Sequence, residues 1–452
     1  MKGEFDMFAK KNVAPVAIML ATVVLASACS GENGGKRGGS DSDSARPEAQ
    51  TPVKREPAEV VFYSNNNDPT ESFDYRFGNT LRQKFPEYTI KYIQSQGITL
   101  EQMIATNTTF DIFFQSIGNY ENFMMPAALE YDMTDLIREH KVDLNKFEPT
   151  IIEAVKQASG GKMYGLPIFT SNLVLYYNKT LFDKFGVPYP KSNATWEETI
   201  ATAKKMARSE GGVSYFGLTH SQKHMFRLNP LSIPNADLAA NAPTINKDER
   251  WKTFYQTLFM DPFQDPVVTD YMKTSGKIPD IYDFTDKQRV AMFPYLSSLI
   301  YAWEQQLKAF NWDIVALPSF TNLPNTGSPS YPTYFGITKT SKSKAAAMEV
   351  LKYMVSDEFQ MELARKGIMP VLKSDDVLKT FGTESPFKDK NLKAVFEKKF
   401  APNAPKALYD AKLIDLYTTY GLKLQKGELD LNTALRQADE DAAKLIAAEL
   451  KK

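Results

Sequence analysis

The chain has 452 residues, of which 43% are hydrophobic and 24% charged, so it holds enough apolar material for one large core or two. It carries 54 Lys and Arg against 54 Asp and Glu, and this balance gives no support for a nucleic acid as partner. A single cysteine excludes disulfide bonds within the chain and metal sites built from several cysteines.

The first 28 residues have the pattern of an export signal. Two lysines precede an uncharged stretch at residues 13–28, whose last three residues are small, and Cys29 follows directly. This stretch is shorter than the roughly 20 apolar residues that a membrane-spanning helix needs. We therefore expect residues 1–28 to be a signal peptide that is cleaved, which predicts an extracytoplasmic location.

The position of Cys29 resembles that in bacterial lipoprotein signals, where the cysteine after the cleavage site receives lipid and becomes the mature N-terminus. The resemblance implies that Cys29 anchors the protein to the cell membrane. One departure is that such signals prefer Leu three residues before the cysteine, whereas this chain has Ala26 there and Leu25 one position earlier. Simple secretion without lipid is the alternative.

Residues 29–57 contain mainly Gly, Ser, Glu, Lys and Pro and almost no large apolar side chain. Such a segment buries too little surface to offset the entropy lost on ordering. We expect it to be a disordered tether between the lipid and the folded part.

Alternating strand and helix patterns follow the tether. Buried strands are expected at 60–63, 89–93 and 111–114, with helical stretches ending near Phe85 and covering 100–106. This alternation predicts parallel strands in an α/β lobe. Polar residues come after two of these strands, at 65–67 and 115–116, and ligands of open α/β sheets bind at the carboxyl ends of strands.

Two helices further along the chain have clear signals. Thr195 and Glu198 form a capping box, which predicts that a helix begins at Thr195. Apolar residues spaced three and four apart from Leu431 to Leu450 predict a long amphipathic helix that packs on the core.

The segments 161–167, 175–182 and 195–198, in this order and spacing, closely resemble the extracellular solute-binding proteins of family 1, the group that includes maltose-binding proteins. Further stretches at 111–113, 133–136, 335–339 and 367–370 fit the same pattern. The similarity extends from about residue 58 over most of the chain.

The resemblance implies an α/β fold of the periplasmic-binding-protein class, type II, with two discontinuous lobes joined by a hinge. Lobe I would comprise 58–167 plus 334–372, and lobe II 168–333 plus 373–452. The ligand would be held in the cleft between the lobes, and the closed protein would deliver it to the transmembrane subunits of an ABC permease. A monomer is expected.

Sugars present apolar ring faces and a rim of hydroxyl groups, so their sites combine aromatic side chains with amides, carboxylates and hydroxyls. The chain has both kinds of side chain where family members place ligand contacts, which implies a carbohydrate ligand. The ligand-binding residues expected on this basis are Tyr63, Asn65, Asn66, Asn67, Ser116, Asn119, Phe169, Thr170, Ser171, Pro294, Tyr295, Tyr331, Tyr334 and Phe335.

Other classes of function find little support in the sequence. His220 and His224 are spaced like a helical metal pair, but the glutamate of a zinc-protease motif is missing. The chain has no nucleophile elbow, P-loop or dinucleotide fingerprint, so we expect no cofactor, no metal and no catalytic activity. The alternatives left open are an exported polysaccharide-acting enzyme and a ligand-presenting sensor partner on the same fold.

Overall fold

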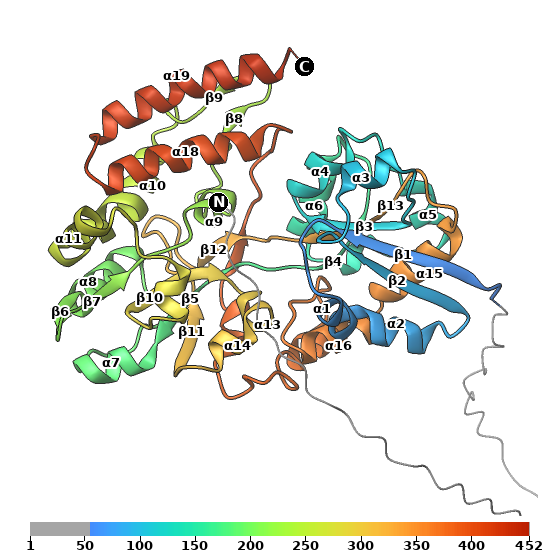
Figure 1. The fold of residues 1–452 in the computed structure, drawn as a ribbon, viewed down its shortest axis with the longest axis horizontal. Helices are drawn as coiled ribbons and strands as arrows, with labels where there is room; N and C mark the ends of the chain where they lie inside the picture. Colours follow the sequence, from blue (N-terminus) through green and yellow to red (C-terminus); the bar gives the residue numbers. More distant parts are fainter. Residues whose placement is uncertain (1–54, 452) are drawn as a thin grey trace, which may run out of the picture. The chain divides into compact units, whose positions relative to one another are not determined.

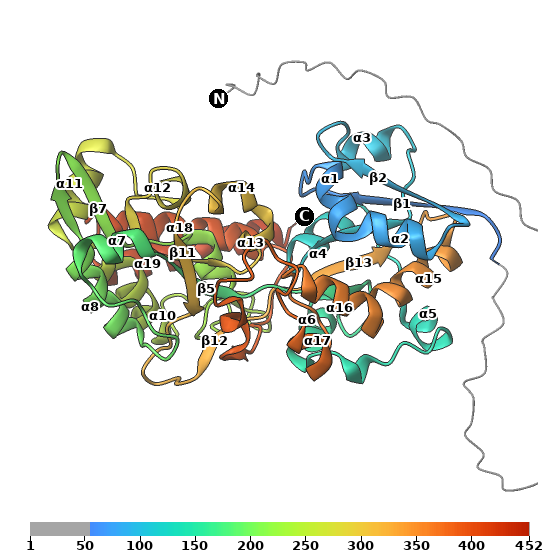
Figure 2. The same ribbon diagram turned by 90° about the horizontal axis from the view of Figure 1, so that it is seen from below.

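The computed structural model describes residues 55–451 (Figure 1). The expected signal peptide, the lipidation site Cys29 and all but the end of the expected tether lie outside the described residues. Within residues 55–451, none of the helices combines the length and the apolar character needed to cross a membrane. This part of the chain is built on two five-stranded sheets, each flanked by helices (Figures 1 and 2).

The first sheet, in the order β2-β1-β3-β13-β4, is the centre of lobe I. β1 pairs in parallel with β2 and β3, which confirms the expected strand-helix-strand connections. β13 enters from much later in the sequence and pairs antiparallel with β3 and β4. The strands are β1 (Ala58–Ser64), β2 (Tyr88–Gln94), β3 (Ile112–Ser116), β4 (Leu166–Phe169) and β13 (Thr333–Ile337).

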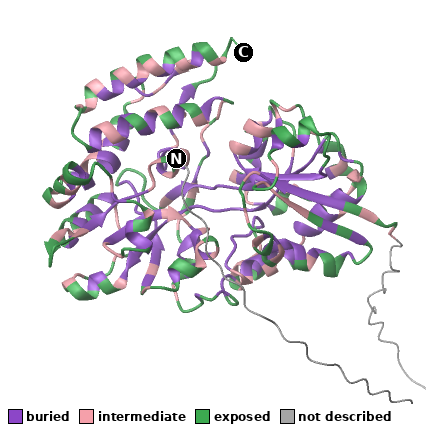
Figure 3. Ribbon diagram, in the orientation of Figure 1, coloured by how far each residue is buried: buried purple, intermediate pink, exposed green. Residues whose placement is uncertain are grey.

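The inner strands of this sheet are buried along nearly their whole length, because helices cover the sheet (Figure 3). Residues 112–114 of β3 are apolar, as such burial requires, whereas Gln115 and Ser116 at its end are polar. The helices of lobe I are α1 (Thr70–Phe73), η1 (Asp74–Gly78), α2 (Asn79–Lys84), α3 (Leu100–Ala105), α4 (Asn119–Met124), α5 (Thr134–Glu139), η2 (Leu144–Lys146), α6 (Pro149–Ala158), α15 (Lys344–Met354) and α16 (Asp357–Arg365).

The second sheet, in the order β11-β5-β10-β7-β6, is the centre of lobe II. β10 pairs in parallel with β7 and antiparallel with β5. The strands are β5 (Leu173–Asn178), β6 (Arg208–Glu210), β7 (Val213–Leu218), β10 (Val290–Leu296) and β11 (Trp312–Ala316). Two further pairs of short strands are formed by β8 (Ala236–Asp237) with β9 (Ala242–Pro243) and by β12 (Thr326–Pro329) with β14 (Lys399–Ala401).

Two helices of lobe II confirm the sequence signals. Thr195 caps α8 through the backbone N–H of Glu198, whose side chain accepts from the backbone of Thr195 in return. α19 is the expected closing helix. The helices of lobe II are α7 (Lys179–Phe185), α8 (Trp196–Met206), α9 (Gln222–Arg227), α10 (Arg250–Tyr255), η3 (Gln256–Met260), η4 (Asp261–Phe263), α11 (Pro266–Ser275), α12 (Ile281–Thr285), α13 (Leu299–Ala302), α14 (Glu304–Leu307), α17 (Asp375–Lys379), η5 (Leu392–Phe396), α18 (Asp410–Gln425) and α19 (Leu431–Glu449).

Three chain segments that pass between the sheets are hydrogen-bonded to one another. The backbones of Ser171 and Tyr331 exchange two hydrogen bonds, of 2.7 and 3.2 Å, and the N–H of Thr170 donates to the carbonyl of Met369 at 3.0 Å. Gln360 of α16 supports this junction, since its amide donates to the carbonyl of Ile168 and accepts from the N–H of Val371. The junction is therefore a small ordered ribbon, which positions the residues on either side of it.

Candidate functional site

The ends of β1 and β3 present polar groups, as the sequence predicts. After β1, Asn66 and Asn67 are exposed and Asn65 is half-buried. Asn67 has a φ of 57°, and its N–H donates to the hydroxyl of Ser95 at 3.1 Å, so the loop is held in a defined shape. These amides are free to bind hydroxyl groups.

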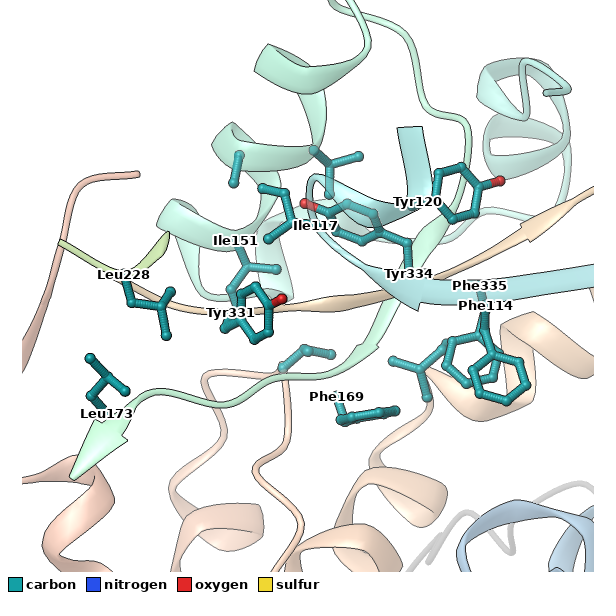
Figure 4. Close-up of a cluster of buried hydrophobic side chains, with 14 of the residues drawn as sticks. Phe114, Ile117, Tyr120, Ile151, Phe169, Leu173, Leu228, Tyr331, Tyr334 and Phe335 are labelled. Carbon is teal, nitrogen blue, oxygen red and sulfur yellow. The ribbon is translucent and has the colours of Figure 1, made fainter. Parts of the chain in front are cut away.

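The end of β3 is joined to a crossing segment by a short hydrogen-bond chain. The amide of Asn119 donates to the hydroxyl of Ser116 at 3.2 Å, and that hydroxyl donates to the phenolic oxygen of Tyr331 at 3.0 Å. Two expected residues at the end of β3 and Tyr331, which is 215 positions after Ser116, are thus brought into one cluster. Figure 4 shows Tyr331 on the segment that leads into β13.

Thr170 and Ser171 lie in the junction itself and are nearly fully buried. The hydroxyls of Ser171 and Ser297 are 2.9 Å apart, and the N–H of Ser298 donates to Ser171 at 3.3 Å. Their polar groups are used within the protein, so these two residues position the crossing rather than offer free groups.

On the lobe II side, Pro294 and Tyr295 lie in β10. Pro294 is buried and pairs with Leu175 of β5, whereas Tyr295 is half-buried. The ring of Tyr295 lies 4.9 Å from that of His224, and burial raises the pKa of the Tyr295 hydroxyl. Tyr295 is therefore a neutral aromatic surface of the kind that stacks on sugar rings.

Four of the expected aromatic contacts belong to the core of lobe I. The ring of Phe335 stacks on that of Phe114 with centroids 4.6 Å apart (Figure 4), Phe169 packs on Phe77, and the side chains of Tyr63 and Phe335 have no exposed surface. Tyr334 is also buried, against Tyr120. In this conformation these four side chains pack against protein and offer no surface to a ligand, because helices cover both faces of the sheet.

A small cavity between the lobes contains charged and amide side chains that sequence reasoning missed. We call it the polar cavity for these side chains, although Ile117, Ala411 and Ile414 also line it. It measures about 20 Å³ and is lined by Asn119 and Tyr331 together with Asn122, Arg227, Lys406 and Asp410. Asp410 is buried, accepts from the amide of Asn235 at 2.9 Å and lies 3.8 Å from Lys406; burial raises the pKa of its carboxyl, partly offset by Lys406. No motif links these positions, because they come from four separate segments of the chain.

A second missed feature is a charged pair beyond β1. Arg76 of η1 bonds Asp68 at 2.6 Å and its guanidinium lies over the ring of Phe77. In lobe II, the pKa of Tyr301 is raised to about 12, chiefly by burial. The charge of Arg76 lowers this pKa and the charge of Asp68 raises it. Tyr75 and Tyr282 are exposed aromatic side chains.

The histidine pair does not form a metal centre. Nε2 of His220 is 2.7 Å from the carbonyl of Leu258, while Nδ1 of His224 is 2.7 Å from the hydroxyl of Ser221. Burial lowers the pKa of both rings to about 4. Within residues 55–451, no three His, Cys, Asp or Glu side chains are grouped as a metal would need.

Known proteins of one family match this chain. The sequence profile of the bacterial extracellular solute-binding proteins matches residues 64–361. A curated binding protein of Brucella abortus is 28% identical over 251 residues, and the match covers 51% of this chain and 56% of the relative. The sn-glycerol-3-phosphate-binding periplasmic protein of the same species is 36% identical over 80 residues, 18% of either chain.

Solved structures show the same fold. A substrate-binding protein of Listeria monocytogenes in complex with cycloalternan has a TM-score of 0.67 and 20% identity, covering 87% of this chain and 100% of its own. An open sugar transporter component of Rhizobium etli also scores 0.67, at 21% identity over 85% and 99%. The sugar-binding protein of Xanthomonas citri scores 0.62 at 15% identity over 86% and 98%. These neighbours are binding proteins with two α/β lobes, which confirms the expected fold class.

Proposed function

Because the chain belongs to the bacterial extracellular solute-binding protein family, whose members are binding proteins and not enzymes, we propose that it binds a sugar or oligosaccharide between its lobes and delivers it to an ABC permease. The observation that carries this proposal is the cluster of Ser116, Asn119 and Tyr331, where the end of β3 meets a crossing segment. Tyr295 supplies an aromatic surface from lobe II, so hydroxyl-binding and ring-stacking groups are both present.

The proposed contacts combine the exposed amides after β1, the hydrogen-bonded cluster at the end of β3 and one half-buried aromatic ring. They are Asn65, Asn66 and Asn67 after β1, the Ser116, Asn119 and Tyr331 cluster, and Tyr295. We further propose that the lobes follow the limits 58–167 plus 334–372 and 168–333 plus 373–452. Two strands of the first sheet reach one or two residues past these limits, since β4 extends to Phe169 and β13 begins at Thr333.

A thermal-shift screen tests the binding function. The form beginning at Ser30 is heated with mono- and oligosaccharides, with amino acids as controls. A ligand at 100 times its Kd stabilises the fold by about 2.7 kcal/mol, which shifts the transition visibly. A panel in which amino acids shift the transition and sugars do not would contradict the carbohydrate assignment.

The site is tested by calorimetry on Asn119→Ala with the sugar that the screen identifies. Losing the amide should weaken binding about tenfold, because one hydrogen bond is removed and the Ser116 hydroxyl loses a neighbour. Asn145→Ala, an exposed change in η2, is the matched control and should leave Kd unchanged. Equal affinities of the two variants would place the ligand elsewhere.

We also propose that Cys29 is lipidated and that the protein acts as a membrane-anchored monomer. Labelled palmitate should be incorporated into the full chain, and this incorporation should be absent in Cys29→Ser.

Light scattering of the form beginning at Ser30 should give the mass of one chain, and a stable dimer would contradict the monomer. Loss of uptake of the identified sugar on deletion of the gene separates transport from sensing.

A further inference from the structure

Arg227, the last residue of α9, lines the polar cavity and is half-buried. Its guanidinium forms no hydrogen bond, ion pair or ring contact with any of residues 55–451. Taking a cation partly out of water without a partner is unfavourable, so such a group is rarely placed without a use.

Every other arginine of the described chain has a partner. Eight of them bind a carboxylate: Arg55, Arg76, Arg82, Arg138, Arg250, Arg289, Arg365 and Arg436. Arg208 donates to the carbonyl of Lys205 and lies over the ring of Phe185. Arg227 is therefore the exception among the arginines of the described chain, and it lines a cavity together with Asn119 and Tyr331, two of the proposed ligand contacts.

Within residues 55–451, no carboxylate forms an ion pair with Arg227, although Asp410 lines the same cavity. His224 is held neutral near pH 7, since its pKa is lowered to about 4 by burial and by Arg227 itself. Asp410 is engaged by Asn235 and faces Lys406. Glu121 accepts from the N–H of Gly118 at 2.7 Å, and burial raises the pKa of its carboxyl, with Lys406 acting against this.

Resting on the proposed function, we propose that Arg227 anchors an acidic substituent of the ligand, so that the bound sugar carries a carboxylate, a phosphate or a sulfate. The planar guanidinium matches two oxygens of such an anion in a bidentate contact. Asn119 and Asn122 line the same cavity and would bind neighbouring hydroxyl groups. A neutral sugar would give Arg227 hydrogen bonds but no counter-charge.

The test compares ligands that differ only in charge, by native mass spectrometry of the form beginning at Ser30. For a carboxylate, oligogalacturonides compete with their methyl esters. For a phosphate or a sulfate, glucose 6-phosphate and glucose 6-sulfate compete with glucose. Neutral oligosaccharides of starch and mannan are added to the same mixture. The proteins are the wild type, Arg227→Gln and the matched control Arg436→Gln, which removes an exposed arginine of α19.

We expect the wild type and R436Q to prefer one acidic ligand over its neutral partner about tenfold to a hundredfold, and R227Q to lose that preference. The ligand pair that shows the preference identifies the anion as a carboxylate, a phosphate or a sulfate. Binding of neutral sugars without an acid preference, or an acid preference kept by R227Q, would overturn the role of Arg227 while the proposed function stands. If the wild type binds none of the sugars, both the role of Arg227 and the proposed function are overturned. Circular dichroism of R227Q checks that this variant is folded.

Discussion

Asp111, directly before β3, connects three segments of lobe I through one buried carboxylate. One oxygen accepts from the N–H of Val61 at 3.0 Å, and the other accepts from the hydroxyl of Ser341 at 2.6 Å. Its partners on β1 and before α15 would remain buried without it. A single side chain thus fixes the spacing of β1, β3 and the segment after β13, and with it the loops that carry the candidate site.

Asp111→Ala should lower the free energy of unfolding by about 3 kcal/mol, because two buried donors lose a charged acceptor. Urea denaturation followed by circular dichroism measures this. Asp135→Ala is the control, since it removes only an exposed ion pair with Arg138 and should cost less than about 1 kcal/mol. Similar losses in both variants would mean that the carboxylate of Asp111 adds no more than a surface charge does.

His220 should make the protein less stable in mild acid. Its ring is fully buried and its pKa is lowered to about 4, whereas an unfolded histidine titrates near 6.5. Between these values the unfolded chain takes up a proton that the folded protein does not, so stability falls as the pH drops from about 6.5 towards 4. At pH 5 the loss from this one ring is about 2 kcal/mol relative to pH 7.5.

The contribution of His220 is isolated with His220→Gln, whose amide can replace Nε2 as the donor to Leu258. The quantity measured is the difference in unfolding free energy between pH 7.5 and pH 5, in both proteins. His224, Glu121 and Asp410 titrate in both and cancel. If the variant keeps the full pH dependence, other groups cause it.

At the scale of single residues, the sequence predicts polarity better than it predicts accessibility. Asn66 and Ser116 were expected at the ends of strands, and the structure places them there. Tyr63 and Phe335 were expected as ligand contacts but are packed in the core. In a sheet covered on both faces the strand residues are apolar throughout, so periodicity does not reveal which side chain faces a cleft.

At the scale of elements, close packing of α8 on β7 depends on one glycine. A Cβ added to Gly217 would lie 2.0 Å from the carbonyl oxygen of Ala203 and 2.5 Å from its carbonyl carbon, both in the backbone of α8. Helix and strand would have to separate. This contact therefore fixes the distance between α8 and the sheet that contains Tyr295.

Gly217→Ala should therefore cost about 3 kcal/mol or more of unfolding free energy, as overpacking a rigid contact does. Thermal unfolding of the variant gives the value. Gly97→Ala serves as the control, because its added Cβ would meet only a carbonyl oxygen at 3.6 Å, and it should change stability little. A variant of Gly217 as stable as that control would contradict the rigid packing.

The polar cavity shows why the elements alone do not reveal the site. Arg227 ends α9, Asp410 begins α18, and Asn119 begins α4, far apart in the sequence. Each of them, taken singly, looks like an ordinary charged or polar residue near a helix end. The strong local signals, the capping box of α8 and the periodicity of α19, are properties of one element and were predicted; contacts between elements carry no such local signal.

At the scale of the whole molecule, three crossing segments link the two lobes within the described residues, and backbone hydrogen bonds at Thr170, Ser171 and Tyr331 join these segments to one another. Such a junction permits bending, because small changes in a few backbone torsions rotate packed lobes without disturbing their cores. Binding between the lobes would then favour the closed arrangement through contacts made to both of them.

Distances between spin labels test this closure. The form beginning at Ser30 has no cysteine, so labels go only to introduced ones. One label pair measures the distance between the lobes and uses Glu101→Cys on α3 and Lys204→Cys on α8, whose side chains are both exposed. Adding the sugar found in the screen should shorten and narrow this distance distribution. Lys204→Cys with Asp270→Cys, both within lobe II, should not change, because each lobe moves as a rigid body. A change confined to the pair within lobe II would show that the ligand remodels one lobe, and unchanged distances in both pairs would mean that the ligand binds without hinge bending.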